Sequence, residues 1–376
     1  MLAERSLINI VKCVLNDEYG YIAAREEWED IIRAAQKHGL LLFVHDYVIQ
    51  TVPSARPDQD TIALLKKLYA PAARKTILQI NAVEQMRSSF ERMGVEHIFI
   101  KGAVTKARYK NDLLRSMTDV DFLYKAEQDE ALKACMADLG FQLKSRGRVH
   151  DIYVRDRLVT AEAHRELLSP GSRYAAFGQG IWERAVPIAD CAHSYEMRIE
   201  DEIIFNTVHM ASHFKKGGVG IRFLVDAWVY HCQEADWEYI EAVLRELGLD
   251  RFYHKILQVA ERWFGPSGED QSSVLPIEEY ILTGGLFGSV KNRNDAVISG
   301  GKLAYLMRAL FPPYRDMQTM FPWLKRQWTL PFAWLVRGIE SACRRRDNVK
   351  TLLRPIHEGD RQNAAALAAF YKDCGL

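Results

Sequence analysis

Apolar residues in the central part of the chain follow the two-residue period of β-strands. A short apolar run at 97–100 ends at a glycine turn, and a helix-compatible segment follows over 103–110. The next strand opens with Asp119 and Asp121, which alternate with apolar residues. Because side chains alternate between the two faces of a strand, we expect these two carboxylates to project together.

Helical periodicity dominates the two ends of the chain. We expect N-terminal helices at 7–15, 28–38, 40–51 and 58–93, the last of which Pro71 can interrupt. From residue 199 onward nearly all of the sequence is helical in pattern. The sequence therefore predicts an α+β fold with three modules. They are an N-terminal helical module at 1–92, a strand-rich core at 93–198 and a C-terminal helical module at 199–376.

The acidic strand and the glycine turn before it suggest a specific chemistry. Carboxylates on one strand face are the oxygen ligands that Mg²⁺ prefers, and Gly102 lets a polyphosphate approach the backbone. Taken alone, an Asp-x-Asp pair is more often a solvated strand edge, and a glycine after a strand most often ends an element. The order of apolar strand, glycine turn, helix and acidic strand favours a nucleotide site.

The succession of Lys101-Gly102, Arg115, Asp119 and Asp121 resembles the uncharacterised bacterial nucleotidyltransferase family of the DNA polymerase β-like superfamily. The resemblance implies a polymerase β-like catalytic core, a small mixed sheet with helices, in which the two aspartates bind Mg²⁺ or Mn²⁺. The superfamily carries Gly-Ser or Gly-Gly where this chain has Lys-Gly. Lys101 and Gly102 are therefore expected at the phosphates, with Lys101 in place of the missing serine.

A second polar alternation, over 158–168, supplies a third carboxylate. Glu162 and His164 alternate with small apolar residues, and the family carries Glu-x-His at this place. The resemblance makes Glu162 the third metal-facing acid and His164 a neighbour that orients it or contacts the nucleotide. The alternative is the polar outer face of an amphipathic strand. Glu166 continues the same alternation and is the main rival to Glu162.

The family also carries an arginine at the position of Arg115. Guanidinium groups match phosphate oxygens, so the resemblance implies that Arg115 contacts the triphosphate. The alternative is a structural ion pair with Asp119 or Asp121.

A helical block at 200–232 resembles the family as well. His209 and His213 are four residues apart on one predicted helix, and Arg222 and Asp226 are four apart on the next. In two-domain nucleotidyltransferases such a unit lines the cleft opposite the acids. By that analogy His209, His213 and Asp226 face the nucleotide or the acceptor. Core packing, or a simple Arg222–Asp226 ion pair, is the alternative.

The composition limits the classes of binding partner and the cellular location that we expect. The net charge of +1 over 376 residues provides no broad basic field for nonspecific nucleic-acid binding. The N-terminus has no signal-peptide pattern, and no apolar run approaches the length needed to span a bilayer. The six cysteines form no Cys-x-x-Cys pair, as in reduced cytosolic proteins. We expect a cytoplasmic protein with no strong tendency to bind membranes.

The activity that follows is a two-metal, in-line transfer of a nucleoside monophosphate from a nucleoside triphosphate to a hydroxyl group, with Asp119, Asp121 and Glu162 as the acids. One alternative is a catalytically weak, nucleotide-binding or regulatory protein of the same fold. Another is kinase-like transfer of the γ-phosphoryl group. The acceptor, whether a small molecule, a protein or RNA, and the base of the nucleotide have no readable signature in the sequence.

Overall fold

The computed structural model describes residues 2–21, 23–24, 27–266, 276–286, 288, 306–307, 310–321, 323–344 and 361–376. The chain forms two compact units. The first comprises Met1–Met210 and Ile221–Ser273, and the second comprises Ala211–Gly220 and Val274–Leu376. The module boundaries expected after residues 92 and 198 remain a prediction.

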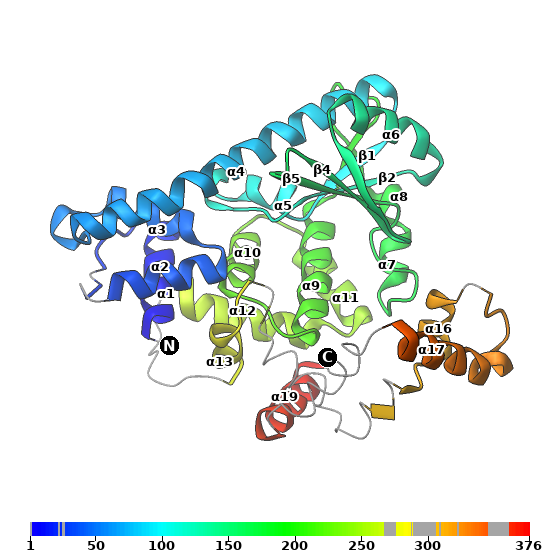
Figure 1. Ribbon diagram of the computed structural model, residues 1–376. Coiled ribbons are helices and arrows are strands. Elements are labelled where there is room, and N and C mark those ends of the chain that lie inside the picture. The colour runs from blue at the N-terminus through cyan, green and yellow to red at the C-terminus, as the bar shows by residue number, and fades with distance from the viewer. Residues whose placement is uncertain are drawn as a thin grey trace. The chain divides into compact units, whose positions relative to one another are not determined.

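The first unit contains a seven-stranded mixed sheet with the order β3-β4-β5-β2-β1-β7-β6 (Figure 1). Its strands are β1 (His97–Ile100), β2 (Val120–Tyr124), β3 (Gln142–Arg146), β4 (His150–Arg155), β5 (Val159–His164), β6 (Val186–Pro187) and β7 (Ser194–Glu196). Strand β2 pairs antiparallel with β1 and parallel with β5. The predicted α+β fold with a mixed sheet is confirmed.

The helices of the first unit are α1 (Leu2–Asn16), α2 (Trp28–His38), α3 (Leu41–Gln50), α4 (Gln59–Met93), α5 (Gly102–Thr105), α6 (Asp129–Asp138), α7 (Ala175–Gln179), α8 (Ile181–Arg184), α10 (Ile221–His231), α11 (Trp237–Leu247) and α12 (Asp250–Phe264). Helix α9 (Ile199–Lys215) passes from the first unit into the second after Met210. The second unit contains α13 (Pro276–Thr283), α16 (Tyr314–Met320), α17 (Leu330–Arg344) and α19 (Arg361–Cys374). Within the described ranges, none of the helices combines the length and apolar character needed to cross a membrane.

Helices α4 and α6 cover one face of the sheet (Figure 1). The core beneath them is built from alternating strand residues and the facing sides of the two helices. Its members include Val120, Phe122, Ala161, Ala163, Met86, Phe90, Leu132 and Met136. The apolar side chains of β2 and β5 point into this core. The residues between them in each strand therefore point to the opposite face of the sheet. That opposite face carries the acids.

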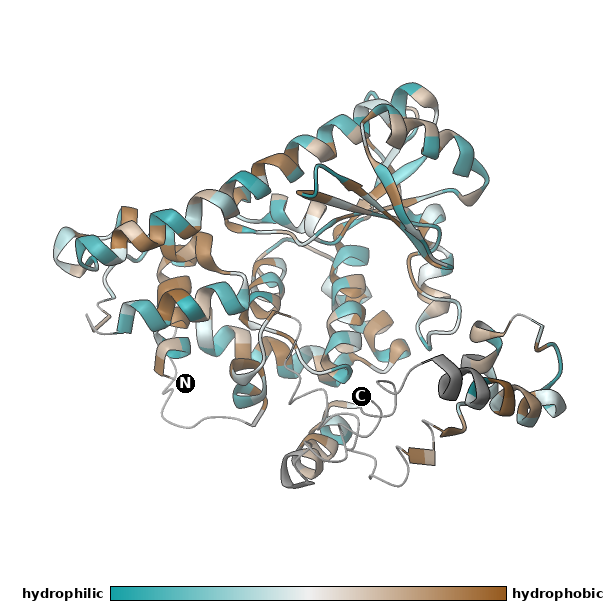
Figure 2. Cartoon of the chain, viewed as in Figure 1, coloured by the Kyte–Doolittle hydropathy of each residue, from teal (hydrophilic) through white to brown (hydrophobic). Residues whose placement is uncertain are grey.

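Helix α4 is continuous, so Pro71 does not interrupt it. The side chain of Asp58 accepts a hydrogen bond from the Thr61 amide at the N-terminus, and Gly94 ends the helix in the left-handed conformation. Pro71 is exposed, and the carbonyl that it leaves without a helical partner can therefore bond to water. Hydrophilic and hydrophobic turns follow one another along α4 (Figure 2).

Candidate active site

Asp121 lies on the sheet face opposite α4, and its side chain is buried. Its Oδ1 accepts a hydrogen bond from Lys101 Nζ at 2.5 Å and lies 2.9 Å from His164 Nε2. Burial would raise the pKa of Asp121, but Lys101 and His164 outweigh it and hold that pKa well below its usual range. Asp121 is therefore a permanently ionised carboxylate in a largely dry position.

Asp119 lies one residue before β2 and is half-buried. Burial and the negative charges of Asp121 and Glu162 raise the pKa of Asp119 to about 6, although Lys101 acts in the opposite direction. Asp119, Asp121 and Glu162 all interact electrostatically with the ammonium group of Lys101. The cluster has an excess of negative charge that a bound cation would neutralise.

Strand pairing places Glu162 beside Asp121. Strands β2 and β5 are parallel neighbours, with Asp121 opposite Glu162 in the register. The alternate residues Val120 and Ala161 are buried in the core on the other face. Glu166 follows the end of β5 and is exposed, so strand alternation no longer controls its direction. Glu162, and not Glu166, is therefore paired in register with the strand that carries Asp121.

Lys101 has a backbone conformation that favours glycine, with φ 52° and ψ −130°. A non-glycine residue in this conformation costs roughly 1–3 kcal/mol of backbone strain. The turn carries a lysine side chain in spite of this strain. Thr105 fixes the turn, because its Oγ1 donates to the Lys101 carbonyl at 2.8 Å. Burial lowers the pKa of Lys101, but Asp121, Glu162 and Asp119 outweigh burial and raise it. The ammonium group is therefore charged and directed into the acids.

Gly102 allows close packing directly after this turn. A Cβ atom at Gly102 would lie 2.9 Å from Met117 Cγ, nearer than carbon atoms approach without a shift. The glycine predicted here for phosphate approach thus also has a packing role, against the loop that leads to Asp119.

His164 and His150 complete the polar face. His164 is buried, and although burial lowers its pKa, hydrogen bonds to Asp121 and Glu162 outweigh this and raise it. His150, on the neighbouring strand β4, is opposite His164 in the register. Sequence reasoning missed His150, because its place beside His164 depends on the pairing of β4 with β5 and not on a local pattern.

Arg115 is buried in an ion pair with Asp226 of α10. Its Nε and Nη2 donate to the two carboxylate oxygens at 2.8 and 2.9 Å, and Tyr109 Oη donates to the same carboxylate at 2.5 Å. The ion pair anticipated for Arg115 therefore exists, but its acceptor is neither Asp119 nor Asp121. Contacts of Arg115 or Asp226 with a nucleotide remain predictions, which would require the two side chains to give up these bonds.

Arg222 does not form the ion pair with Asp226 that their helical spacing suggested, because Arg115 takes both carboxylate oxygens. Arg222 is buried, its Nη1 donates to the Ser116 carbonyl at 3.2 Å, and its Nε has no hydrogen-bond partner. Burial and the nearby Arg115 lower the pKa of Arg222 to about 9.

The two predicted histidines of α9 lie in different units. The His209 ring stacks on Phe205, with centroids 6.3 Å apart, and lies 6.1 Å from the Phe223 ring. His209 therefore packs among aromatic side chains. His213 belongs to the second unit, so its position relative to the acids is not defined. Roles for both in nucleotide or acceptor binding remain predictions.

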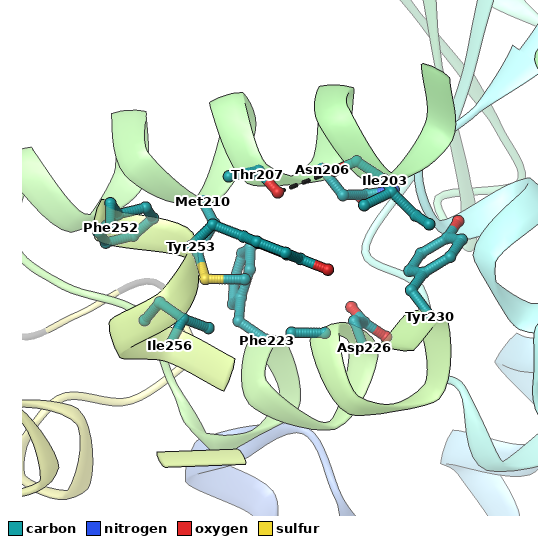
Figure 3. A pocket seen from close by; sticks show the side chains of 11 residues that line it. Ile203, Asn206, Thr207, Met210, Phe223, Asp226, Tyr230, Phe252, Tyr253 and Ile256 are labelled. Carbon is teal, nitrogen blue, oxygen red and sulfur yellow. Dashed lines mark hydrogen bonds between the residues drawn. The ribbon is translucent and has the colours of Figure 1, made fainter. Parts of the chain in front are cut away.

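The described part of the first unit includes a small cavity and a larger one. A cavity of about 20 Å³ between α9, α10 and α12 has room for about one water molecule. Asp226 and Tyr230 line it, and the Tyr253 hydroxyl points into it (Figure 3). This cavity is too small for a nucleotide. A larger cavity of about 250 Å³ is lined by residues that include Leu123 and Trp182. Leu123 follows Asp121 by two positions on the same strand, and the two side chains therefore lie on the same face of the sheet.

Comparison with known proteins assigns the chain to a protein family. No curated protein matches the chain. A solution structure of the antibiotic-resistance factor ANT(2'')-Ia is similar at 12% identity and a TM-score of 0.37, over 50% of this chain and 98% of that one. A crystal structure of ANT(2'')-Ia with adenylyl-2''-tobramycin is similar at 12% identity and a TM-score of 0.36, over 45% and 97%. Residues 24–265 match the uncharacterised nucleotidyltransferases, and the chain belongs to this family.

Proposed function

We propose that the protein transfers a nucleoside monophosphate from a nucleoside triphosphate to a hydroxyl group of an acceptor, with the help of divalent metal ions. The observation that carries this proposal is the convergence of Asp119, Asp121 and Glu162 around the ammonium group of Lys101. Membership of a nucleotidyltransferase family supports the nucleotide as the donor.

The donor set fits a hard divalent cation. Asp119, Asp121 and Glu162 offer carboxylate oxygens, which Mg²⁺ and Mn²⁺ favour as ligands. Burial first, and then the negative charges of Asp121 and Glu162, raise the pKa of Asp119 to about 6, although Lys101 lowers it. Metal ions held by these three residues would neutralise phosphate charge and make the acceptor hydroxyl more acidic.

The residues of the chain have distinct tasks in this reaction. The acceptor oxygen bonds to the α-phosphorus while the bond from that phosphorus to the bridging oxygen breaks, and pyrophosphate leaves. Glu162 takes the hydroxyl proton as general base. Lys101 offers its charge to the phosphate oxygens, and the imidazole of His164 holds the Asp121 carboxylate in position.

We place the acceptor in the cavity of about 250 Å³ beside Leu123. Leu123 lies two residues after Asp121 on β2, and the lining combines the carboxylate of Glu166 with the indole of Trp182. A mixed polar and aromatic lining suits a small molecule better than a folded macromolecule.

The direct test uses each of the four nucleoside triphosphates, labelled at the α-phosphate or, in a parallel reaction, at the γ-phosphate, with Mg²⁺ or Mn²⁺ and an extract of the source cells as acceptor pool. Label on a product supports the proposal, and the size of that product identifies the acceptor class. Label that moves only from the γ-phosphate indicates kinase-like transfer instead. Metal-dependent nucleotide binding without transfer of either label favours a regulatory protein.

A matched pair of variants tests the third acid. We expect Glu162→Gln to lose about a hundredfold or more in transfer rate, because it removes a general base and metal ligand without changing shape. Glu166→Gln should lose far less, because Glu166 lines the proposed acceptor cavity outside the strand register of Asp121 and glutamine keeps its shape. The measurement is the initial rate of α-label transfer. Loss in Glu166→Gln with activity in Glu162→Gln would reverse the assignment.

A further inference from the structure

Two imidazoles and one carboxylate converge at the edge of the acid cluster. His150, Glu162 and His164 each offer a ligand atom within 4.8 Å of the others. Glu162 Oε2 lies 3.8 Å from His150 Nε2 and 3.6 Å from His164 Nε2. The pairing of β4 with β5 fixes this arrangement, since His150 is opposite His164 in the register.

We propose that His150, Glu162 and His164 together bind one divalent cation of the Mn²⁺, Co²⁺ or Zn²⁺ class. Glu162 is also an acid of the proposed transferase site, so the same ion would serve that site. The binding of the ion is independent of the reaction, whereas its use in catalysis rests on the proposed function.

Ligand chemistry selects this class of ion. Imidazole nitrogen suits first-row transition metals, whereas Mg²⁺ prefers oxygen ligands alone. Bonds of 2.0–2.2 Å to nitrogen and oxygen separate neighbouring tetrahedral ligands by about 3.4 Å. The observed separations of 3.6 and 3.8 Å therefore need to shrink by only a few tenths of an ångström.

The surroundings leave the position accessible and connect it to the other acids. The His150 side chain is 36% exposed and that of Glu162 is 20% exposed, so an ion can enter from solvent. His164 is buried, and its Nε2 lies 2.9 Å from Asp121 Oδ1, so an ion bound at Nε2 would replace this hydrogen bond and lie beside the Asp121 carboxylate. A second carboxylate thus lies beside the same imidazole, which links the two-histidine site to Asp121. The consequence for the proposed transferase is a preference for Mn²⁺ or Co²⁺ over Mg²⁺.

The experiment uses the metal alone, without nucleotide. Wild-type protein titrated with Co²⁺ should show visible absorption typical of nitrogen-containing coordination and bind about one ion at this site. His150→Ala should bind Co²⁺ about tenfold or more weakly, as expected when one ligand in three is lost. The matched control is His254→Ala, which removes an exposed histidine from a pair with Glu241 that has no third ligand in the described chain.

The outcomes separate this inference from the proposed function. Equal Co²⁺ affinity in wild type and His150→Ala, with both proteins folded by circular dichroism, overturns the metal site. Equal weakening in His254→Ala also overturns it. Nucleotidyl transfer that proceeds with Mg²⁺ in a protein that does not bind Co²⁺ would leave the proposed function standing alone. Co²⁺ binding without transfer would support the site and count against the function.

Discussion

Asp121→Asn is expected to reduce nucleotidyl transfer by about a thousandfold while the protein stays folded. The change removes a metal-binding charge, and such charge contributes several kcal/mol to transfer at about 1.4 kcal/mol per factor of ten. Asparagine keeps the shape of the side chain and an oxygen that accepts from Lys101. Alanine is the poorer choice, because it would leave the buried Lys101 ammonium without its nearest partner.

Transfer of α-label in the cell extract measures this effect, and a thermal melt by circular dichroism reports folding. The matched control is Asp138→Asn, at an exposed aspartate on α6, the helix that covers the sheet face opposite the acids. It should leave both readouts unchanged. Transfer at the wild-type rate by folded Asp121→Asn would remove the carboxylate cluster from the proposed mechanism.

The direction of the acids was predictable because it depends on local alternation. The apolar side chains of Val120 and Phe122 are expected to be buried in the core. Because side chains alternate along a strand, Asp121 then lies on the other face. The same reasoning applied to Glu162 between Ala161 and Ala163. The structure has both acids on that face, in neighbouring strands.

The partners of the acids were not predictable, because they come from distant parts of the fold. Lys101 meets Asp121 only because β1 pairs with β2. His150 joins the cluster through the pairing of β4 with β5. A helical spacing of four suggested that Arg222 pairs with Asp226, yet a residue 111 positions away in the sequence takes that carboxylate. Burial explains the difference, since a bidentate pair satisfies a buried carboxylate better than a single contact.

Arg115→Met is expected to lower the free energy of unfolding by about 3–5 kcal/mol, the usual cost of removing one partner of a buried ion pair. The variant would leave the Asp226 carboxylate buried, with the Tyr109 hydroxyl as its remaining hydrogen-bond donor in the described part of the chain. Arg115 also joins the loop before β2 to α10, so the loss should reach the position of Asp119. Urea unfolding followed by circular dichroism measures the change.

Arg222→Met provides the matched control, because Arg222 is equally buried but has no carboxylate within ion-pair distance in the described chain. Methionine keeps much of the length of the side chain and removes a buried charge whose Nε has no partner. We expect a much smaller loss of stability than in Arg115→Met, since the bonds that disappear are those to the Ser116 carbonyl and hydroxyl, which are uncharged groups. Combining Arg115→Met with Asp226→Leu should recover part of the loss, because no unpaired charge then remains buried. Equal losses in the two single variants would mean that the Arg115–Asp226 pair does not stabilise this junction.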